Sequence, residues 1–214
     1  MVKPNDEKFF EQYQERCEAC SNGGKVVIPK PDPFNATKRV EVVFINERPG
    51  PIGPRKSGYI SFDNPDESAK FFKELFCETF GLNYRERILI TNACLWYPDL
   101  PNYRNRTPTA TEINCGLPIL KDQIDCLKPL LIVTVGARAL GAVRKLYPSK
   151  KLQKARLKTH VGILIDDTPI PVFPVYHTSL LGRTHRSREK QKRDWMKLKE
   201  ALKILEKNKE GRLL

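Results

Sequence analysis

The stretch VEVVFINERPG, residues 40–50, places a run of apolar, partly β-branched residues directly before an abrupt polar end. The apolar part predicts a buried β-strand, because such runs are typical of strands that are covered on both faces. The run stops at the triplet NER and the turn-forming pair PG. Any polar residue would end a strand, so the single carboxylate in this triplet, Glu47, is a candidate for chemistry.

Three further apolar runs follow along the chain: RILITN (87–92), LLIVTV (130–135) and IPVFPVYH (170–177). Between these runs and after the last one, apolar residues recur every three or four positions, which predicts helices. Strands that alternate with helices are typical of a parallel sheet with helices on both faces. We therefore predict a single-domain α/β fold with three layers, αβα, in which the central layer is a four-stranded parallel sheet.

Three helix starts can be predicted from local chemistry. Asn64 is the expected N-cap of a helix whose first residue is Pro65. Thr109 and Glu112 match the capping box S/T-x-x-E. Gly136 is expected to open the helix that follows the third strand.

The first part of the chain differs from the rest. Residues 1–20 have a helical pattern and are followed by a proline-rich connector. We expect residues 1–39 to form a helical extension that binds a metal or caps the domain, and residues 40–214 to form the α/β domain.

The chain has a net charge of +13. Lysine and arginine gain binding free energy when they release counterions from phosphates, so the charge favours a nucleic-acid partner over a merely solvated lysine-rich surface. No apolar run approaches the roughly 20 residues that span a bilayer, and no signal-peptide core is present. We expect an intracellular, cytoplasmic protein, most simply a monomer, that does not enter a membrane.

The predicted strands end in chemically distinctive residues. Because parallel strands end at the same edge of a sheet, Glu47, Asn92, Gly136 and His177 are expected on one rim, where ligands of such sheets bind. An amide or a histidine at a strand end is more often structural than functional. A carboxylate, an amide and an imidazole that converge on one rim form a more specific pattern.

Five segments together resemble the uracil-DNA glycosylase superfamily, and within it most closely the iron–sulfur-containing family 4. These are FINERPG, ITN, NRTPTATEI, IVTVGARAL and VYHTSLLGR, in the family's order over roughly residues 40–205. The resemblance implies a monofunctional glycosylase, which hydrolyses the N-glycosidic bond of a uracil flipped out of DNA and leaves an abasic site. No lysine is placed by a motif at the pocket, so no lyase step is expected.

The resemblance implies catalytic roles for three residues. Glu47 would orient water and stabilise the cationic sugar, and His177 would donate a hydrogen bond from a neutral imidazole to the departing base. Asn105 lies where the family has a further active-site asparagine. The structural alternatives are a Glu47 that caps a helix or forms an ion pair with Arg48, and a His177 whose bonds are satisfied within the fold.

Base recognition and DNA binding involve two more sets of residues. The resemblance assigns Asn92 to the edge of uracil and implies a stacking aromatic ring, for which Phe62 is the first choice and Tyr59 the second. Asn46 is expected to border the pocket. For the DNA we expect hydroxyl groups on phosphates, a leucine wedge in the vacated stack and a basic contact to the backbone. These residues are Thr178, Ser179, Leu180, Leu181 and Arg183.

The chain has six cysteines, which an intracellular protein is unlikely to use as a disulfide framework. Cys17 and Cys20 have the C-x2-C spacing that lets two thiolates reach one metal. The resemblance adds Cys94 and Cys115 and implies a structural [4Fe–4S] cluster. Zinc and scattered, unliganded cysteines are the alternatives, and the remaining two cysteines are expected in the core.

Two other functions stay open at this point. The first keeps the glycosylase but changes the base to hypoxanthine, xanthine or a mismatched thymine, because Asn46 stands where the family has glycine. The second is a non-catalytic, cluster-bearing protein that binds nucleic acid. The presence of both the acid and the histidine disfavours this second function.

Overall fold

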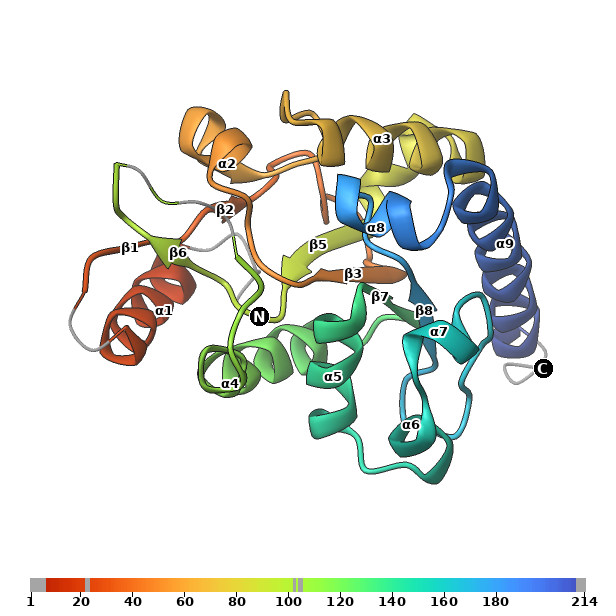
Figure 1. Cartoon of the computed structure of the whole chain (residues 1–214). Coiled ribbons are helices and arrows are strands. Elements are labelled where there is room, and N and C mark those ends of the chain that lie inside the picture. Colours follow the sequence, from red (N-terminus) through yellow and green to blue (C-terminus); the bar gives the residue numbers. More distant parts are fainter. Residues whose placement is uncertain (1–6, 22–23, 102, 104–105, 211–214) are drawn as a thin grey trace.

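The computed structural model describes residues 7–21, 24–101, 103 and 106–210. Four strands form the central sheet: β3 (Val42–Asn46), β5 (Ile88–Asn92), β7 (Leu131–Val135) and β8 (Val172–Val175). All neighbours are parallel, in the order β5-β3-β7-β8 (Figure 1). The predicted four-stranded parallel sheet is confirmed, and β3 lies in its interior.

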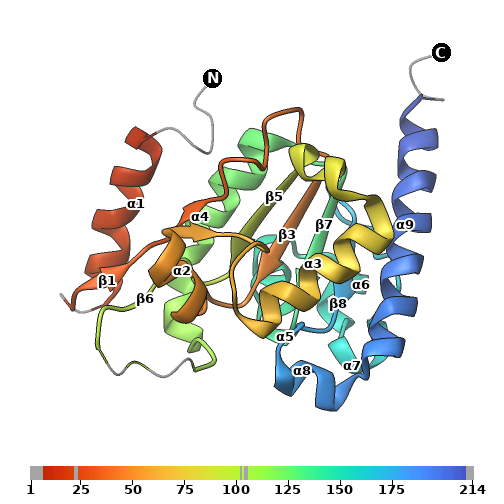
Figure 2. The same ribbon diagram turned by 90° about the horizontal axis from the view of Figure 1, so that it is seen from above.

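Helices cover both faces of this sheet, as predicted. One face carries α3 (Glu67–Phe80) and α9 (Arg188–Glu210), and the other carries α4 (Ala110–Leu127) and α5 (Ala137–Leu146) (Figures 1 and 2). Alternation along β3 sends Phe44 to the first face and Val43 and Ile45 to the second. Each strand is apolar throughout because both of its faces are buried.

Aromatic side chains dominate the face of the sheet beneath α3 and α9. Phe44 on β3 stacks on Trp195 of α9, with ring centroids 5.5 Å apart, and meets the edge of Phe72 of α3 at 5.3 Å. Phe62 stacks on Phe76 of α3 at 5.1 Å. Burial of each such ring stabilises the fold by roughly 1.5–3 kcal/mol, so the loop that contains Phe62 is held firmly against the sheet.

One predicted helix start is wrong by two residues. The N-cap of α3 is Asp66, whose carboxylate accepts the Ala69 N–H at 3.0 Å, and the helix begins at Glu67. Asn64 instead donates its side-chain N–H to the carbonyl of Tyr59 at 3.0 Å. Both residues are good caps locally, and the fold uses the amide to hold the preceding loop.

The other two predicted starts are confirmed. Thr109 and Glu112 form a complete capping box at α4: the Thr109 hydroxyl accepts the Glu112 N–H at 3.2 Å, and the Glu112 carboxylate accepts the Thr109 N–H at 2.8 Å. Gly136 is the N-cap of α5, with a φ of +102° that disfavours any other residue.

The remaining elements are short, apart from the N-terminal helix. Helix α1 (Glu7–Cys20) packs beside α4. The other elements are β1 (Val26–Val27), β2 (Lys30–Pro31), α2 (Ile52–Ser57), β4 (Tyr59–Ile60), the 3₁₀ helix η1 (Leu82–Arg87), β6 (Tyr97–Pro98), α6 (Lys150–Lys154), α7 (Leu157–His160) and α8 (Leu180–His185). Strand β1 pairs with β6, and β2 pairs with β4.

Helix α1 contributes Tyr13 and Cys17 to a buried cluster that also contains Ile119 of α4. The division into an extension over 1–39 and a domain over 40–214 stays a prediction. Among the described residues, no helix combines the length and the apolar character that crossing a bilayer requires.

Candidate active site

The ends of the four strands form one rim, as predicted. Asn46 and Asn92, the last residues of β3 and β5, are partners in the sheet register. The chain after β3 passes through α2 and β4 to α3 on one face, whereas the chain after β7 leads directly to α5 on the other. Ligands of open α/β sheets bind at such a topological switch point. Glu47 and Gly136, which follow these two strands, meet there.

Two cavities open at this rim. The inner pocket has a volume of about 150 Å³ and is lined by Asn46, Phe62, Asn92 and His177, among others. The outer cleft has a volume of about 710 Å³, and Glu47 and Gly136 are among the residues that line it. His177 borders both spaces, so the imidazole stands between the amides of the pocket and the carboxylate of the cleft.

The Glu47 carboxylate lies at the N-terminus of α5. Its Oε1 atom accepts the backbone N–H of Arg138 at 3.1 Å and lies against Gly136. The positive end of the helix dipole favours a negative charge at this place. Arg48 turns away to pair with Glu112, and within the described residues Glu47 takes part in no ion pair. The alternative of a Glu47–Arg48 ion pair is therefore excluded, whereas the alternative of a helix-capping Glu47 agrees with its bond to the Arg138 N–H at the start of α5.

His177 is held as a neutral imidazole. Burial lowers its pKa, and the carboxylates of Glu47 and Asp66 only partly oppose this effect. The Nδ1 atom accepts the backbone N–H of Ser179 at 3.0 Å. A neutral ring that accepts at Nδ1 carries its proton on Nε2, so His177 offers one N–H donor at the border of the two cavities.

Asn92 has an unused hydrogen-bond donor in the inner pocket. The residue is 1% exposed, and its Nδ2 atom is buried without a partner in the described part of the chain. An unpaired buried donor costs about 1–3 kcal/mol, so it marks a place where a ligand atom is expected. Asn46 and Phe62 line the same pocket.

One predicted base-binding residue, Tyr59, is not brought to the pocket. Tyr59 is 37% exposed and is absent from the pocket lining, because neighbouring residues of β4 point to opposite sides and Ile60 takes the buried one. Phe62 is thus the ring available for stacking. Asn105 lies outside the described residues.

The loop after His177 exposes its two leucines to solvent, as predicted, but it does not expose all of its polar side chains. Leu180 and Leu181 are 71% and 66% exposed at the start of α8. Thr178 is a correction: it is buried, and its hydroxyl donates to the Ser68 carbonyl at 2.9 Å, so it cannot reach a phosphate. Ser179 caps α8 by accepting the Gly182 N–H at 3.3 Å.

Arg183 and Gly182 in the same loop also contribute to the fold. The Arg183 guanidinium lies 5.8 Å from the ring centroid of Phe71. A Cβ atom at Gly182 would overlap the His177 carbonyl, so the glycine lets α8 pack directly on the residue that borders both cavities. The sequence contained a signal for this close packing that we missed, namely the glycine at position 182 in the first turn of a helix.

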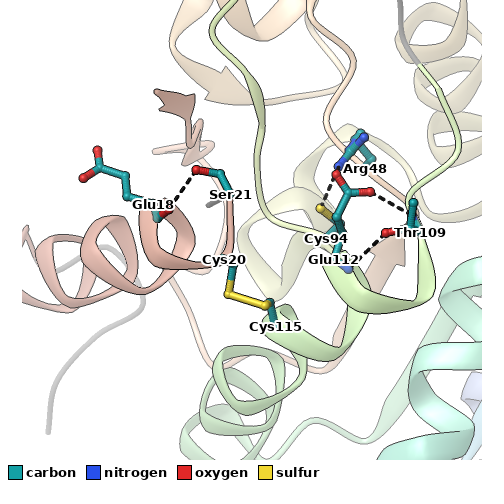
Figure 3. The surroundings of a disulfide bond; sticks show 8 residues. All are labelled: Glu18, Cys20, Ser21, Arg48, Cys94, Thr109, Glu112 and Cys115. Carbon is teal, nitrogen blue, oxygen red and sulfur yellow. Dashed lines mark hydrogen bonds and ion pairs between the residues drawn. A yellow bond between two sulfur atoms is a disulfide. The ribbon is translucent and has the colours of Figure 1, made fainter. Parts of the chain in front are cut away.

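The four candidate metal-binding cysteines lie in two pairs. Cys20 and Cys115 are joined in a disulfide (Figure 3). Cys17 and Cys94 are free thiols in one buried cluster. Burial raises the pKa of Cys17 to about 12, and the nearby Cys94 adds to this effect. Cys94 accepts a hydrogen bond from Arg48 at 3.3 Å. The described residues contain no group of three or more His, Cys, Asp or Glu side chains that could hold a metal ion.

The sequence interpretation missed a buried network around Glu112. Burial by itself would raise the pKa of this carboxyl, but hydrogen bonds from Arg106, the Thr109 N–H and Arg48 lower it to about 2. Glu112 therefore stays ionised between two arginines as well as serving as a cap. The signal was present at Arg48, a charge directly after a buried strand, but its partner is 64 residues away.

Basic side chains on the outer cleft were also missed. Arg106, Arg138, Arg156 and Lys158 line the space around Glu47. One of them had a readable signal: Arg138 lies in the first turn of α5, where the helix dipole disfavours a cation. A cation in that position is more easily explained by an anionic ligand than by helix stability.

Comparisons with known proteins agree with this site. The sequence profile of the family described as "Uracil DNA glycosylase superfamily" matches residues 33–203. The chain is 30% identical to the type-4 uracil-DNA glycosylase of Saccharolobus solfataricus over 180 residues, which cover 79% of this chain and 75% of that protein. It is 27% identical to the type-4 uracil-DNA glycosylase of Sulfurisphaera tokodaii over 178 residues, or 78% and 73% of the two chains. The chain therefore belongs to the uracil DNA glycosylase superfamily, a family of DNA glycosylases.

Proposed function

We propose that this glycosylase removes uracil from DNA by hydrolysing its N-glycosidic bond, and that it leaves an abasic site. The observation that carries the proposal is the unpaired, buried amide N–H of Asn92 in a pocket that adjoins a carboxylate. The target base must leave the duplex stack to enter such a pocket. The 30% identity to a type-4 uracil-DNA glycosylase supports the same base.

Asn92 and Phe62 would recognise the base. The free Asn92 N–H suits a uracil carbonyl, and its amide oxygen can accept the ring N3–H. Phe62 is 2% exposed and is backed by Phe72 and Phe76, so it presents a rigid surface to a flat ring. The resulting site rejects bases that leave the amide unpaired, because an unpaired buried donor is costly.

His177 would stabilise the departing base. Negative charge builds on the pyrimidine as the glycosidic bond breaks, and an N–H donor aimed at the carbonyl oxygen lowers the energy of that state. The support for this role is the Ser179 N–H at 3.0 Å, which occupies Nδ1 and leaves the proton on Nε2. A neutral donor can stabilise an anion without first holding a charge in a desolvated pocket.

Glu47 would act on the sugar and on water. The carboxylate can stabilise the cationic sugar electrostatically and orient the water molecule that attacks it. Its support is the Arg138 N–H at 3.1 Å from one oxygen, which fixes the direction of the carboxylate at the wall of the cleft. No lysine is required as a nucleophile, so the reaction ends at the abasic site.

The outer cleft would hold the DNA backbone next to the flipped nucleotide. Its arginine and lysine side chains suit phosphates. The exposed Leu180 and Leu181 suit the gap that the flipped base leaves in the stack. Of the predicted phosphate contacts, Ser179 and Arg183 remain in the proposal and Thr178 does not.

We also propose that Cys17, Cys20, Cys94 and Cys115 hold a [4Fe–4S] cluster. The residue types fit, because all four are cysteines, and they come from three segments. In this structure Cys20 and Cys115 are joined as a disulfide, Cys17 and Cys94 lie in one buried cluster, and no three of the described side chains form a metal-binding group. Cysteine thiolates are the ordinary ligands of such a cluster. When bound, the cluster would tie α1 to α4 and to the loop after β5. Hydrolysis of the glycosidic bond uses no electron transfer.

The test is release of the base from labelled duplexes that carry one uracil, hypoxanthine, xanthine or a G·T mismatch, followed by alkaline cleavage at abasic sites. We expect the wild type to act on uracil and Glu47→Gln to lose about 10²–10⁴-fold in rate, the range for general acid–base groups. Glu86→Gln, a surface carboxylate paired with Lys38, is the control and should stay active.

The same experiment distinguishes the alternatives. Asn46 lies beside Asn92 in the register and adds a second amide to the pocket, which favours a further or different base. Cleavage of another base in preference to uracil would establish that function. Binding of DNA without cleavage of any of the four substrates would leave a non-catalytic nucleic-acid-binding protein.

A further inference from the structure

Arg48, the residue directly after Glu47, is almost completely buried, with 1% of its side chain exposed. Its Nη2 atom donates to the Glu112 carboxylate at 2.6 Å and to the Cys94 sulfur at 3.3 Å (Figure 3). Its Nη1 atom donates to the Tyr103 hydroxyl at 2.8 Å, and the guanidinium lies 5.2 Å from the ring centroid of Trp96. Four partners from three segments therefore determine one orientation of this side chain.

A buried arginine of this kind resists displacement. Removing a charge from water costs several kcal/mol, and the cost is recovered only with good geometry and satisfied hydrogen bonds. Both Nη atoms of Arg48 are bonded, whereas its buried Nε has no partner among the described residues. The planar guanidinium matches several acceptors at once, and a rotated side chain would lose them together. The backbone at residue 48 is therefore anchored to the start of α4 and to the loop after β5.

The backbone around Glu47 is tied to the same loop. The Ala93 N–H donates to the Asn46 carbonyl at 2.8 Å, and the Cys94 N–H donates to the Glu47 carbonyl at 3.0 Å. With its own carbonyl held and Arg48 anchored behind it, the Glu47 side chain points into the outer cleft, where it accepts the Arg138 N–H.

We propose that Arg48 is a positioning residue for the Glu47 carboxylate, because its buried contacts with Glu112, Cys94 and Tyr103 fix the end of β3 on which that carboxylate stands. This inference rests on the proposed function in one respect, namely that Glu47 faces the reacting sugar. Arg48 is among the residues that line both cavities, but only 1% of its side chain is exposed, so its guanidinium faces its buried partners rather than the substrate.

The first test measures single-turnover base release at saturating enzyme, together with the Kd for substrate DNA. Arg48→Met should lower the rate by about 10²-fold, as expected for a small misplacement of a catalytic group, with a Kd within about twofold of wild type. Arg48→Lys keeps the positive charge but loses the planar, two-pronged guanidinium, so its rate should lie between those of the wild type and Arg48→Met. Arg87→Met is the matched control, because Arg87 pairs with Glu41 before the other end of β3 and should not affect the rate.

A second variant separates positioning from stability. Arg48→Met alone removes one of the two arginines that pair with the Glu112 carboxylate, leaves Arg106 as the other, and lowers Tm. The double variant Arg48→Met with Glu112→Gln removes both charges and keeps a residue that can complete the capping box. We expect this double variant to regain most of the Tm and little of the rate. Recovery of both together would overturn the proposal and leave Arg48 a purely structural residue.

A binding measurement reads the position of Glu47 without turnover. The probes are two oligonucleotides, one with a cationic pyrrolidine abasic analogue and one with a neutral tetrahydrofuran analogue. The wild type should prefer the cationic probe at least tenfold, and both Arg48→Met and Glu47→Gln should lose the preference. An unchanged preference in Arg48→Met overturns the positioning role, whereas a wild type without preference and without activity on any base overturns the proposed function.

Discussion

The Glu47 carboxylate occupies the space that a side chain at Gly136 would fill. A Cβ atom built on residue 136 would overlap both the Oε1 atom and the carboxyl carbon of Glu47. The same glycine has a φ of +102° at the start of α5. One residue therefore meets two requirements: a backbone turn that opens the helix, and room for an acid at the N-terminus of that helix.

Gly136→Ala should harm both folding and activity. The strained backbone costs about 1–3 kcal/mol of unfolding free energy, and the methyl group displaces the carboxylate. Urea unfolding and base release would measure the two effects. Gly141→Ala is the control on the same helix, because nothing lies within 4 Å of its added Cβ, so it should be neutral or stabilise the protein by up to about 1 kcal/mol. Equal behaviour of the two variants would contradict the prediction.

His177 should make stability depend on pH in a defined direction. Burial lowers its pKa in the folded state, so between that value and the unfolded value of about 6.5 the unfolded chain binds more protons. The contribution of His177 to the unfolding free energy is therefore constant above about pH 6.5 and decreases below it, by at most about 1.4 kcal/mol per pH unit. The measurement is urea unfolding of wild type and His177→Gln between pH 5.5 and 8. If the difference in unfolding free energy between wild type and His177→Gln does not shrink toward low pH, the lowered pKa of His177 is refuted.

The two exposed leucines of α8 should matter for duplex DNA only. Leu180→Ala with Leu181→Ala removes the apolar surface that replaces a flipped base in the stack, so release from a duplex should fall about tenfold or more. A single strand needs no such replacement, and its rate should change little. Tm should also be unchanged, since both side chains are mostly exposed. Ile204→Ala, at 55% exposure on α9, is the control. An equal loss on both substrates would argue against a wedge.

Metal analysis should separate the cluster from the disulfide. Protein purified without oxygen should contain about four iron atoms and matching sulfide, and Cys17→Ser should lose most of them. Cys77→Ser, on α3 and away from the other cysteines, should retain the full iron content. An iron-free wild type whose Cys20 and Cys115 stay resistant to alkylation until reduced would show that the disulfide is the native state.

The strands and their common rim could be predicted because their signals are local. An apolar run between helical patterns needs both faces covered, and parallel strands that are joined by helices must end at one edge. Glu47, Asn92 and His177 therefore share a rim as soon as the sheet exists. The capping box at Thr109 is equally local, since both of its bonds close within three residues.

Other features depend on partners far along the chain. Thr178 is a hydroxyl in a polar turn by sequence, yet α3 supplies the Ser68 carbonyl that draws it inward. Arg48 stands beside Glu47 in the sequence but pairs with Glu112 across 64 residues, because that carboxylate lies in the same buried space. Nearby donors and acceptors compete for each polar side chain, and this competition decides its hydrogen-bond partner. That set of neighbours exists only once the helices have packed on the sheet.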